Sequence, residues 1–242
     1  MRNMLKVLTQ NLWFDAHERQ LRMEGHVAQW QAYQPDVIAV QEATLACLRP
    51  LLASPWLQSQ YWSSANLESD AGWQGVVVFS KVPPERAWMT PLPGNMGRRL
   101  LNVQLKDLHL GVVHLESTSG GAPVRAQQLT TIFASLASSP DALLVGDFNL
   151  CSSSAENAQL PSDYLDLWPH LHPGDPGLTQ DTDINTMMLK QFRKQKAVRY
   201  DRMLLRSRAW QATAIERVGM EELAPGLFAS DHFGLCAQLE RR

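Results

Sequence analysis

The feature that most constrains the fold of this chain is a series of short apolar runs, each bounded by polar residues. Eight such runs are rich in valine and leucine, which is typical of buried β-strands. They occupy residues 5–8, 37–40, 76–79, 100–105, 108–115, 143–145, 203–205 and 233–239. None approaches the roughly 20 apolar residues that a bilayer-spanning helix needs, so we expect no membrane partner.

Helical periodicity appears in two of the segments between these runs. Residues 17–33 and 123–138 carry apolar side chains at helical spacing. Pro35 ends the first segment, and Pro123 suits the first turn of the second. Two apolar runs are separated only by Lys106-Asp107, which predicts a β-hairpin. The chain therefore has a mixed α/β character.

The composition is typical of one globular domain. Of the 242 residues, 45% are hydrophobic and 19% are charged, and no linker interrupts them, so we expect one domain over residues 1–242. The three cysteines form no CxxC pair, which disfavours a disulfide framework and a structural zinc site. The N-terminus has no signal-peptide core. We expect a monomer in the cytoplasm, or in the nucleus if the organism is eukaryotic.

Positive charge is concentrated in one segment, which we call the basic strip. Residues 190–208 contain eight basic residues and one acidic residue, whereas the whole chain has a formal net charge of −2. A basic strip on an acidic body suits an anionic ligand that is held at one place. From charge alone, a solvated basic loop is the simpler interpretation.

Six polar side chains of acid–base or metal-binding type stand next to apolar runs. They are Asn11, Glu42, His114, Asp147, Asp201 and His232. Any one of them has a simpler explanation, because Asn11 could form a turn, Glu42 could start a helix and His114 could be a core histidine. Strand ends gather at one rim of a sheet, so six such residues in succession indicate a shared site.

The chemistry of these six groups is coherent. A carboxylate and an amide can bind Mg²⁺ through oxygen and leave room for water and phosphate. An aspartate can orient and deprotonate a water molecule. Two histidines can donate hydrogen bonds to phosphate oxygens as charge builds. No serine or cysteine stands in a recognised nucleophile motif, so we expect direct attack by water.

Four short motifs resemble the signatures of the endonuclease/exonuclease/phosphatase superfamily. They are Gln10-Asn11, Gln41-Glu42, Gly146-Asp147-Phe148-Asn149 and Ser230-Asp231-His232. The resemblance extends over residues 7–239. It implies a four-layer α/β sandwich, in which two mixed β-sheets pack face to face and helices flank them.

The resemblance also implies a metal side and a water side of the site. Glu42 binds the divalent metal, with Asn11 beside it and Asp231 on the same side. Asp147 positions or activates the attacking water, and Asn149 helps to hold that water or the phosphate. The implied metal is Mg²⁺, with Mn²⁺ as the alternative.

Two histidines complete the implied site. His232 contacts the scissile phosphate and stabilises the transition state. Asp201 pairs with His232 and fixes its tautomer. His114 is a second phosphate contact.

Three further segments resemble the 5′-tyrosyl-DNA phosphodiesterases of this superfamily. Residues 114–118 read HLEST, residues 199–203 resemble RFDRI, and residues 230–235 resemble SDHWGL. These enzymes hydrolyse the bond between a tyrosine and a 5′-phosphate of DNA or RNA. The resemblance implies that Ser117 donates to the phosphate. It also implies that the basic strip contacts the nucleic-acid backbone through Arg193, Lys194, Lys196 and Arg199.

Two departures from the pattern of this group concern substrate contacts. Cys151 stands where the group has an arginine, and Gln180 stands where it has a tryptophan that lines the substrate groove. Stacking of a base on an aromatic ring contributes roughly 1–3 kcal/mol. The losses therefore indicate either a lower affinity for DNA ends or a different substrate.

The sequence thus predicts a Mg²⁺-dependent phosphodiesterase that acts on nucleic-acid 5′ ends carrying an adduct such as phosphotyrosine. A general or abasic-site endonuclease, or a phosphatase of small or lipid phosphates, is the alternative within the same superfamily. A non-catalytic binding module is disfavoured, because Glu42, Asp147 and His232 are all present.

Overall fold

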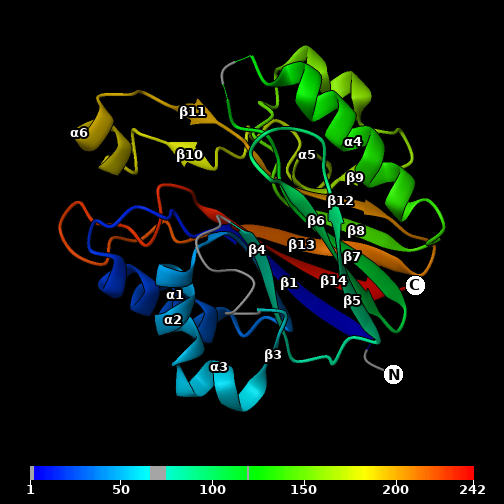
Figure 1. The fold of residues 1–242 in the computed structure, drawn as a ribbon, viewed down its shortest axis with the longest axis horizontal. Coiled ribbons are helices and arrows are strands. Elements are labelled where there is room, and N and C mark those ends of the chain that lie inside the picture. The colour runs from blue at the N-terminus through cyan, green and yellow to red at the C-terminus, as the bar shows by residue number, and fades with distance from the viewer. Residues whose placement is uncertain (1–2, 66–74, 119) are drawn as a thin grey trace.

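The computed structural model describes residues 3–65, 75–118 and 120–242, which form strands and helices in a mixed order (Figure 1). The strands are β1 Met4–Asn11, β2 Val37–Ala43, β3 Trp62–Ser63, β4 Gly75–Ser80, β5 Arg86–Pro91, β6 Arg99–Leu105, β7 Leu108–His114, β8 Ala142–Asp147, β9 Leu165–Asp166, β10 Gln180–Asp181, β11 Ala197–Val198, β12 Asp201–Arg206, β13 Trp210–Val218 and β14 Gly234–Arg241. The helices are α1 Arg19–Tyr33, α2 Leu45–Leu52, α3 Pro55–Gln60, α4 Ala122–Leu136, α5 Leu167–Leu171 and α6 Met187–Phe192, with a 3₁₀ turn, η1, at Ala155–Gln159.

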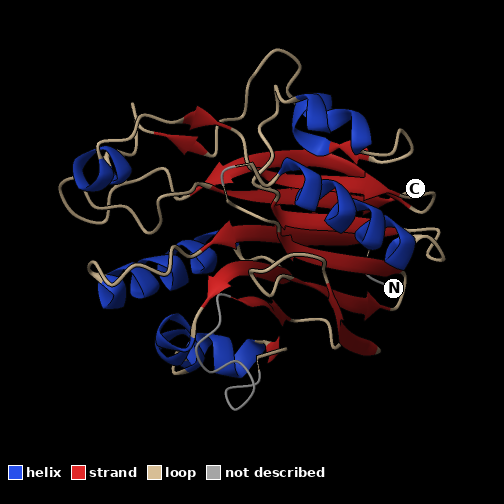
Figure 2. Ribbon diagram, turned by 45° about the horizontal axis from the view of Figure 1, so that its top comes forward, coloured by secondary structure: helices blue, strands red, loops and turns tan. Residues whose placement is uncertain are grey.

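Two six-stranded mixed sheets form the centre of the molecule. Their strand orders are β13-β14-β1-β2-β4-β3 and β5-β6-β7-β8-β12-β9. Helices α1, α2 and α3 cover the outer face of the first sheet, and α4 covers the outer face of the second (Figures 1 and 2). The predicted four-layer α/β sandwich is therefore confirmed. No helix in the described part of the chain has both the length and the apolar character to cross a membrane.

Alternation along each strand divides the apolar side chains between two environments. Val7 lies in the core between the sheets, whereas its neighbour Leu8 lies in the core under α1 and α2. The same alternation separates Val112 from Val113 on β7. Successive residues of a strand point to opposite faces, and here both faces are covered. This is why the central strands read as continuous apolar runs.

The directions of the strands bring the polar residues at the ends of the apolar runs to one edge. Strands β1 and β2 are parallel and β14 is antiparallel to them, so the ends of β1 and β2 lie beside the start of β14. In the second sheet β7 and β8 are parallel and β12 runs against them. The ends of β7 and β8 therefore lie beside the start of β12.

Most of the predicted elements are confirmed, and the missed ones are short or lie at sheet edges. All eight apolar runs are strands, and residues 17–33 and 123–138 contain α1 and α4. The predicted hairpin is present, with Leu105 paired to Leu108. Edge strands β5 and β13 were not predicted, because neither contains a continuous buried apolar run: β5 has no buried residue, and exposed positions interrupt β13. Helix α2 was also missed, since it is short and contains Pro50.

Gly146→Ala should destabilise the protein by about 3 kcal/mol or more. Gly146 has a φ of +133°, and an added Cβ would lie 2.0 Å from the carbonyl oxygen of Val113 on the paired strand. Gly75→Ala is the matched control, because a Cβ there meets no atom of the described residues within 4 Å. Chemical denaturation of both variants measures the difference. Equal midpoints for the two variants would contradict this interpretation.

Candidate active site

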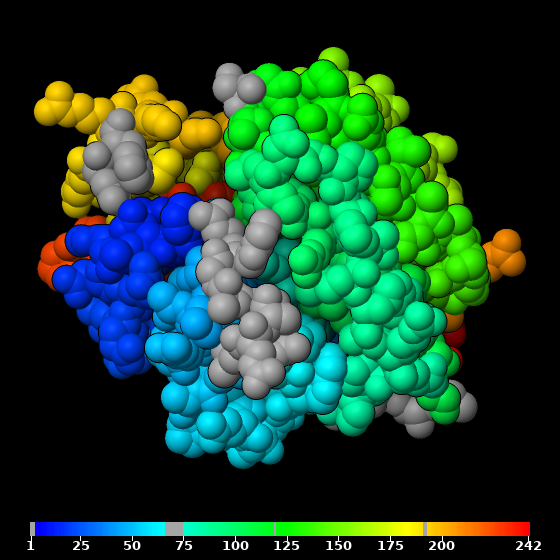
Figure 3. Space-filling view, in the orientation of Figure 1, coloured from blue at the N-terminus to red at the C-terminus, as the bar shows by residue number. Residues whose placement is uncertain are grey.

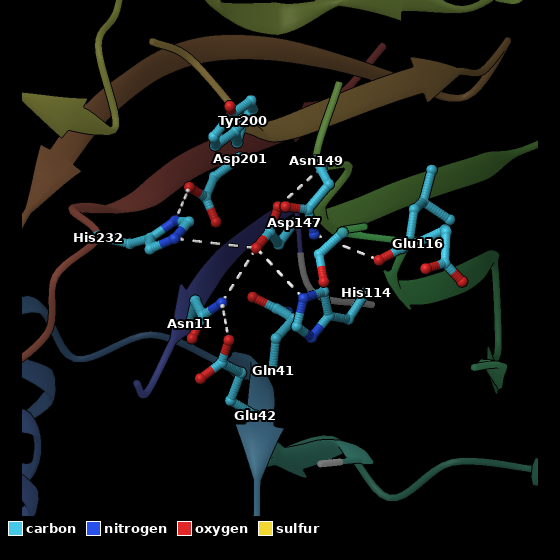
Figure 4. Close-up of polar contacts among 12 residues, drawn as sticks. Asn11, Gln41, Glu42, His114, Glu116, Asp147, Asn149, Tyr200, Asp201 and His232 are labelled. Atoms are coloured by element: carbon cyan, nitrogen blue, oxygen red, sulfur yellow. Dashed lines mark hydrogen bonds and ion pairs between the residues drawn. The ribbon is translucent and has the colours of Figure 1, made fainter. Parts of the chain in front are cut away.

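The two sheets are joined at the shared edge by Asn11, the last residue of β1. Its amide nitrogen donates to Oδ2 of Asp147 at 3.0 Å and to Oε1 of Glu42 at 3.2 Å (Figure 4). Its amide oxygen accepts from the backbone N–H of Trp13 at 2.9 Å, and this contact fixes which end of the amide faces the carboxylates. Asn11 therefore orients Glu42 and Asp147 through its amide nitrogen.

Asp147 is the centre of the site and is 1% exposed. Its Oδ1 accepts from the backbone N–H of Asn149 at 2.8 Å, and the side-chain nitrogen of Asn149 is bound to the carbonyl of Leu115 at 3.2 Å. Burial alone would raise the pKa of Asp147, but the facing His114 and His232 outweigh it and hold that pKa below its usual range. Asp147 is therefore ionised at neutral pH.

His114 faces Asp147 as a neutral donor. Its Nδ1 lies 2.9 Å from the guanidinium of Arg98, which can only donate, so Nδ1 accepts and the proton is on Nε2. Burial lowers the pKa of His114 to about 3, against an opposing effect of Asp147. Nε2 lies 3.5 Å from Oδ2 of Asp147, which is longer than a hydrogen bond. The N–H therefore remains available to a substrate or water oxygen placed beside both groups.

His232 faces the same oxygen as a charged donor. Its Nδ1 donates to Oδ2 of Asp201 at 2.7 Å, and its Nε2 lies 3.9 Å from Oδ2 of Asp147. Burial works against the charged form, but the carboxylates of Asp201, Asp231 and Asp147 raise the pKa of His232 well above its usual value. The pairing of His232 with Asp201, implied by the sequence resemblance, is present in the geometry.

Glu42 is turned into the site by an irregular stretch of β2. The pairing of β2 with β4 shifts register between Val40 and Ala43, and Glu42 has a φ of +56°. Its Oε2 accepts from the backbone N–H of Phe14 at 2.8 Å. Burial raises the pKa of Glu42 to about 7, and the nearby carboxylate of Asp231 adds to this effect. The surrounding groups thus compensate the negative charge of the Glu42 carboxylate only in part.

Asp231 lies on the same side and has a similar environment. It is 8% exposed, and burial raises its pKa. Its Oδ2 accepts from the side-chain nitrogen of Gln180 at 3.0 Å. Gln180 is itself buried, so it faces Asp231 instead of lining an open groove.

These carboxylates fit a divalent cation. Glu42 and Asp231 repel each other, and a bound cation would relieve that repulsion with the hard oxygen ligands that Mg²⁺ prefers. A second group, formed by Asp147, Asp201 and His232, also offers ligand atoms within 4.8 Å of one another. In that group His232 and Asp201 already bind each other, so Glu42 and Asp231 are the better-suited pair.

The basic strip is divided by the fold. Arg193 and Lys194 are exposed after α6, and Lys196 lies with its ammonium 5.0 Å from the ring centre of Tyr200. Arg199 differs from the expectation of a backbone contact. It is 5% exposed and donates to both carboxylate oxygens of Asp166 at 3.0 and 2.8 Å.

Two further arginines of the strip are bound to other groups of the fold. Arg202 binds Asp166 and the carbonyl of Leu150, and Arg206 binds the carbonyls of Leu136 and Ser139 at the opposite end of β12. Among the described residues of the strip, exposed basic side chains therefore lie both before β12, as at Arg193 and Lys194, and beyond its far end, at Arg208. The sequence pattern could not show this, because it counts charge without showing which side chains are paired.

Ser117 and Arg98 form a further polar pair at the rim. Ser117 is exposed and its hydroxyl accepts from the guanidinium of Arg98 at 3.3 Å. Arg98 was not predicted as a site residue. The predicted hairpin could have identified Arg98. Pairing Leu105 with Leu108 places residue 99 opposite His114, and Arg98 is then next to that pair.

Similarity to known proteins agrees with this geometry. Residues 8–232 match the model of the endonuclease/exonuclease/phosphatase family. Tyrosyl-DNA phosphodiesterase 2 from Homo sapiens is 29% identical over 98% of this chain and 68% of its own length. The same enzyme from Bos taurus is 27% identical over 90% of this chain and 63% of its own length. The match thus covers about two thirds of these relatives.

Solved structures give the same result. Tyrosyl-DNA phosphodiesterase 2 from Danio rerio, in complex with a single-strand DNA product, superposes with a TM-score of 0.87 at 25% identity, over 99% of this chain and 100% of that one. The catalytic domain of human nocturnin shares the fold, with a TM-score of 0.71 at 15% identity over 99% and 94% of the two chains. The fold, the site and the family match together show that this chain belongs to the endonuclease/exonuclease/phosphatase family of phosphoester hydrolases.

Proposed function

We propose that this protein is a Mg²⁺-dependent phosphodiesterase that removes tyrosyl adducts from the 5′ ends of nucleic acid. The observation that carries the proposal is the convergence of Asn11, His114 and His232 on one carboxylate, Asp147, at the shared edge of two sheets. Similarity over nearly the whole chain to tyrosyl-DNA phosphodiesterase 2 supports the substrate class.

The protein's own groups suit a direct attack by water on phosphorus. Asp147, ionised between the two histidines, orients a water molecule and accepts its proton. His232 as a cation and His114 as a neutral donor stabilise the charge that builds on the phosphate oxygens. The bond from phosphorus to the tyrosyl oxygen breaks, and the tyrosine leaves with an oxygen whose ordinary pKa is about 10.

A divalent cation would be held by Glu42 and Asp231, with Asn11 holding Glu42 in place. When bound, it supplies Lewis-acid polarisation of the phosphate. Basic side chains beyond α6 would bind the strand that follows the scissile phosphate. The segment from α6 to β11 (yellow) lies across from the N-terminal segment (blue) on the face shown in Figure 3.

The deciding assay uses an oligonucleotide with a 5′-phosphotyrosine and a second one with a plain 5′-phosphate and an internal abasic site, each with Mg²⁺. We expect release of tyrosine and an intact 5′-phosphorylated strand. Asp147→Asn should lower kcat by about 10²–10⁴-fold with little change in substrate affinity, because it removes the base and keeps the shape. Internal nicking would instead identify a nuclease, and cleavage of neither substrate would favour small or lipid phosphates.

Asp201→Asn should move the alkaline limb of the kcat profile to lower pH by at least about one unit. His232 is active when protonated, so kcat falls as pH rises through its pKa. Asp201 raises that pKa against the effect of burial, and its removal lets the pKa fall. Measurement of kcat across the pH range checks this. An unchanged limb would show that His232 does not act as a cation.

Charge removal beyond α6 should weaken nucleic-acid binding in a salt-dependent way. The double variant Arg193→Gln/Lys194→Gln should raise KM and reduce the slope of log KM against log salt by about one to two, because fewer counterions are released. Arg208→Gln is the control, since Arg208 is exposed at the far end of β12. Equal slopes for the double variant and the control would indicate that this segment is only a solvated loop.

A further inference from the structure

Arg22, on α1, is a buried cation whose guanidinium lies 4.6 Å from the ring centre of Trp13 and whose hydrogen bonds in the described structure go to backbone. It is 0% exposed, and its five hydrogen bonds to described residues all end on carbonyl oxygens. These belong to His17 (2.8 Å), Leu12 (3.0 Å), Ala229 (3.2 Å), Trp13 (3.0 Å) and Asp15 (2.7 Å). Burial lowers the pKa of Arg22. A buried charge without a bound carboxylate costs folding free energy. The structural contribution of Arg22 therefore lies in its contacts to the loops.

The loop after β1 is held between Arg22 and the active site. The carbonyls of Leu12 and Trp13 accept from Arg22, while the next N–H groups point the other way. The N–H of Trp13 binds Oδ1 of Asn11, and the N–H of Phe14 binds Oε2 of Glu42. Each peptide therefore links the guanidinium on one side to an active-site side chain on the other.

The same guanidinium also contacts the loop that carries Asp231, the second of the two carboxylates suited to a cation. Its Nη1 donates to the carbonyls of both Leu12 and Ala229, and Ala229 lies two residues before Asp231. The loops that follow β1 and precede β14 are thus joined by one side chain.

We propose that Arg22 is a positioning residue that sets the separation of Glu42 and Asp231 by joining their two supporting loops through backbone carbonyls. Its planar fork of five N–H donors matches this array, and the three donors of a lysine at the end of a flexible stem do not. The effect on cation binding rests on the proposed function. The effect on loop order does not.

The test compares Arg22→Lys with Arg206→Lys. Arg206 also donates to two carbonyls, of Leu136 (2.7 Å) and Ser139 (2.6 Å), but lies at the far end of β12. In the metal-free proteins, amide exchange at Trp13 and Phe14 should be at least tenfold faster in Arg22→Lys and unchanged in Arg206→Lys. Unchanged exchange in Arg22→Lys would overturn the proposal, whatever the enzyme does.

Cation binding gives the second readout. Calorimetric titration with Mg²⁺ should show about a tenfold weaker affinity in Arg22→Lys than in Arg206→Lys, the size expected for loss of an outer-shell partner. Arg22→Ala should regain affinity when methylguanidinium is added, and the effect should saturate. Equal affinities for the two lysine variants would overturn the metal-side role. If the wild-type protein itself binds no Mg²⁺, the proposed function fails, and amide exchange still decides the role of Arg22.

Discussion

Two sheets can share one active site only if they are locked face to face, and the core between them supplies that constraint. Val7 and Ala39 of the first sheet and Val112 and Val145 of the second belong to one continuous apolar cluster. Interiors of this kind are close-packed, so the relative position of the two sheets is set to within a small tolerance. The bond from Asn11 to Asp147 at the edge depends on that position.

Electrostatic asymmetry follows from this arrangement. His114 and His232 approach the same oxygen of Asp147 and are both buried, yet they carry different charges. His114 has Arg98 behind it, which opposes a second positive charge, whereas His232 has Asp201 behind it. Burial favours the neutral form of both rings and prevails at His114, whereas the carboxylates around His232 outweigh it, so the site obtains one neutral and one charged donor from the same residue type.

The positions of the carboxylates suited to a cation depend on backbone contacts more than on side-chain contacts. Glu42 takes a left-handed backbone conformation and is bound by the N–H of Phe14. Such a conformation is strained for a non-glycine residue and persists because the surrounding contacts determine it. Buried Arg22 binds the carbonyls of Leu12 and Trp13, in the loop whose Phe14 N–H binds Glu42.

The sequence by itself determined the central strands and the order of the residues at their ends. Continuous apolar runs and the polar residues that bound them are local properties, so the six residues could be selected before any contact was known: Asn11, Glu42, His114, Asp147, Asp201 and His232. The tertiary structure decided the partners. Arg199 became a partner of Asp166, Arg98 became a partner of His114, and Gln180 turned to Asp231. Pairing and burial depend on residues far apart in the chain, and charge counting along the sequence contains no information about them.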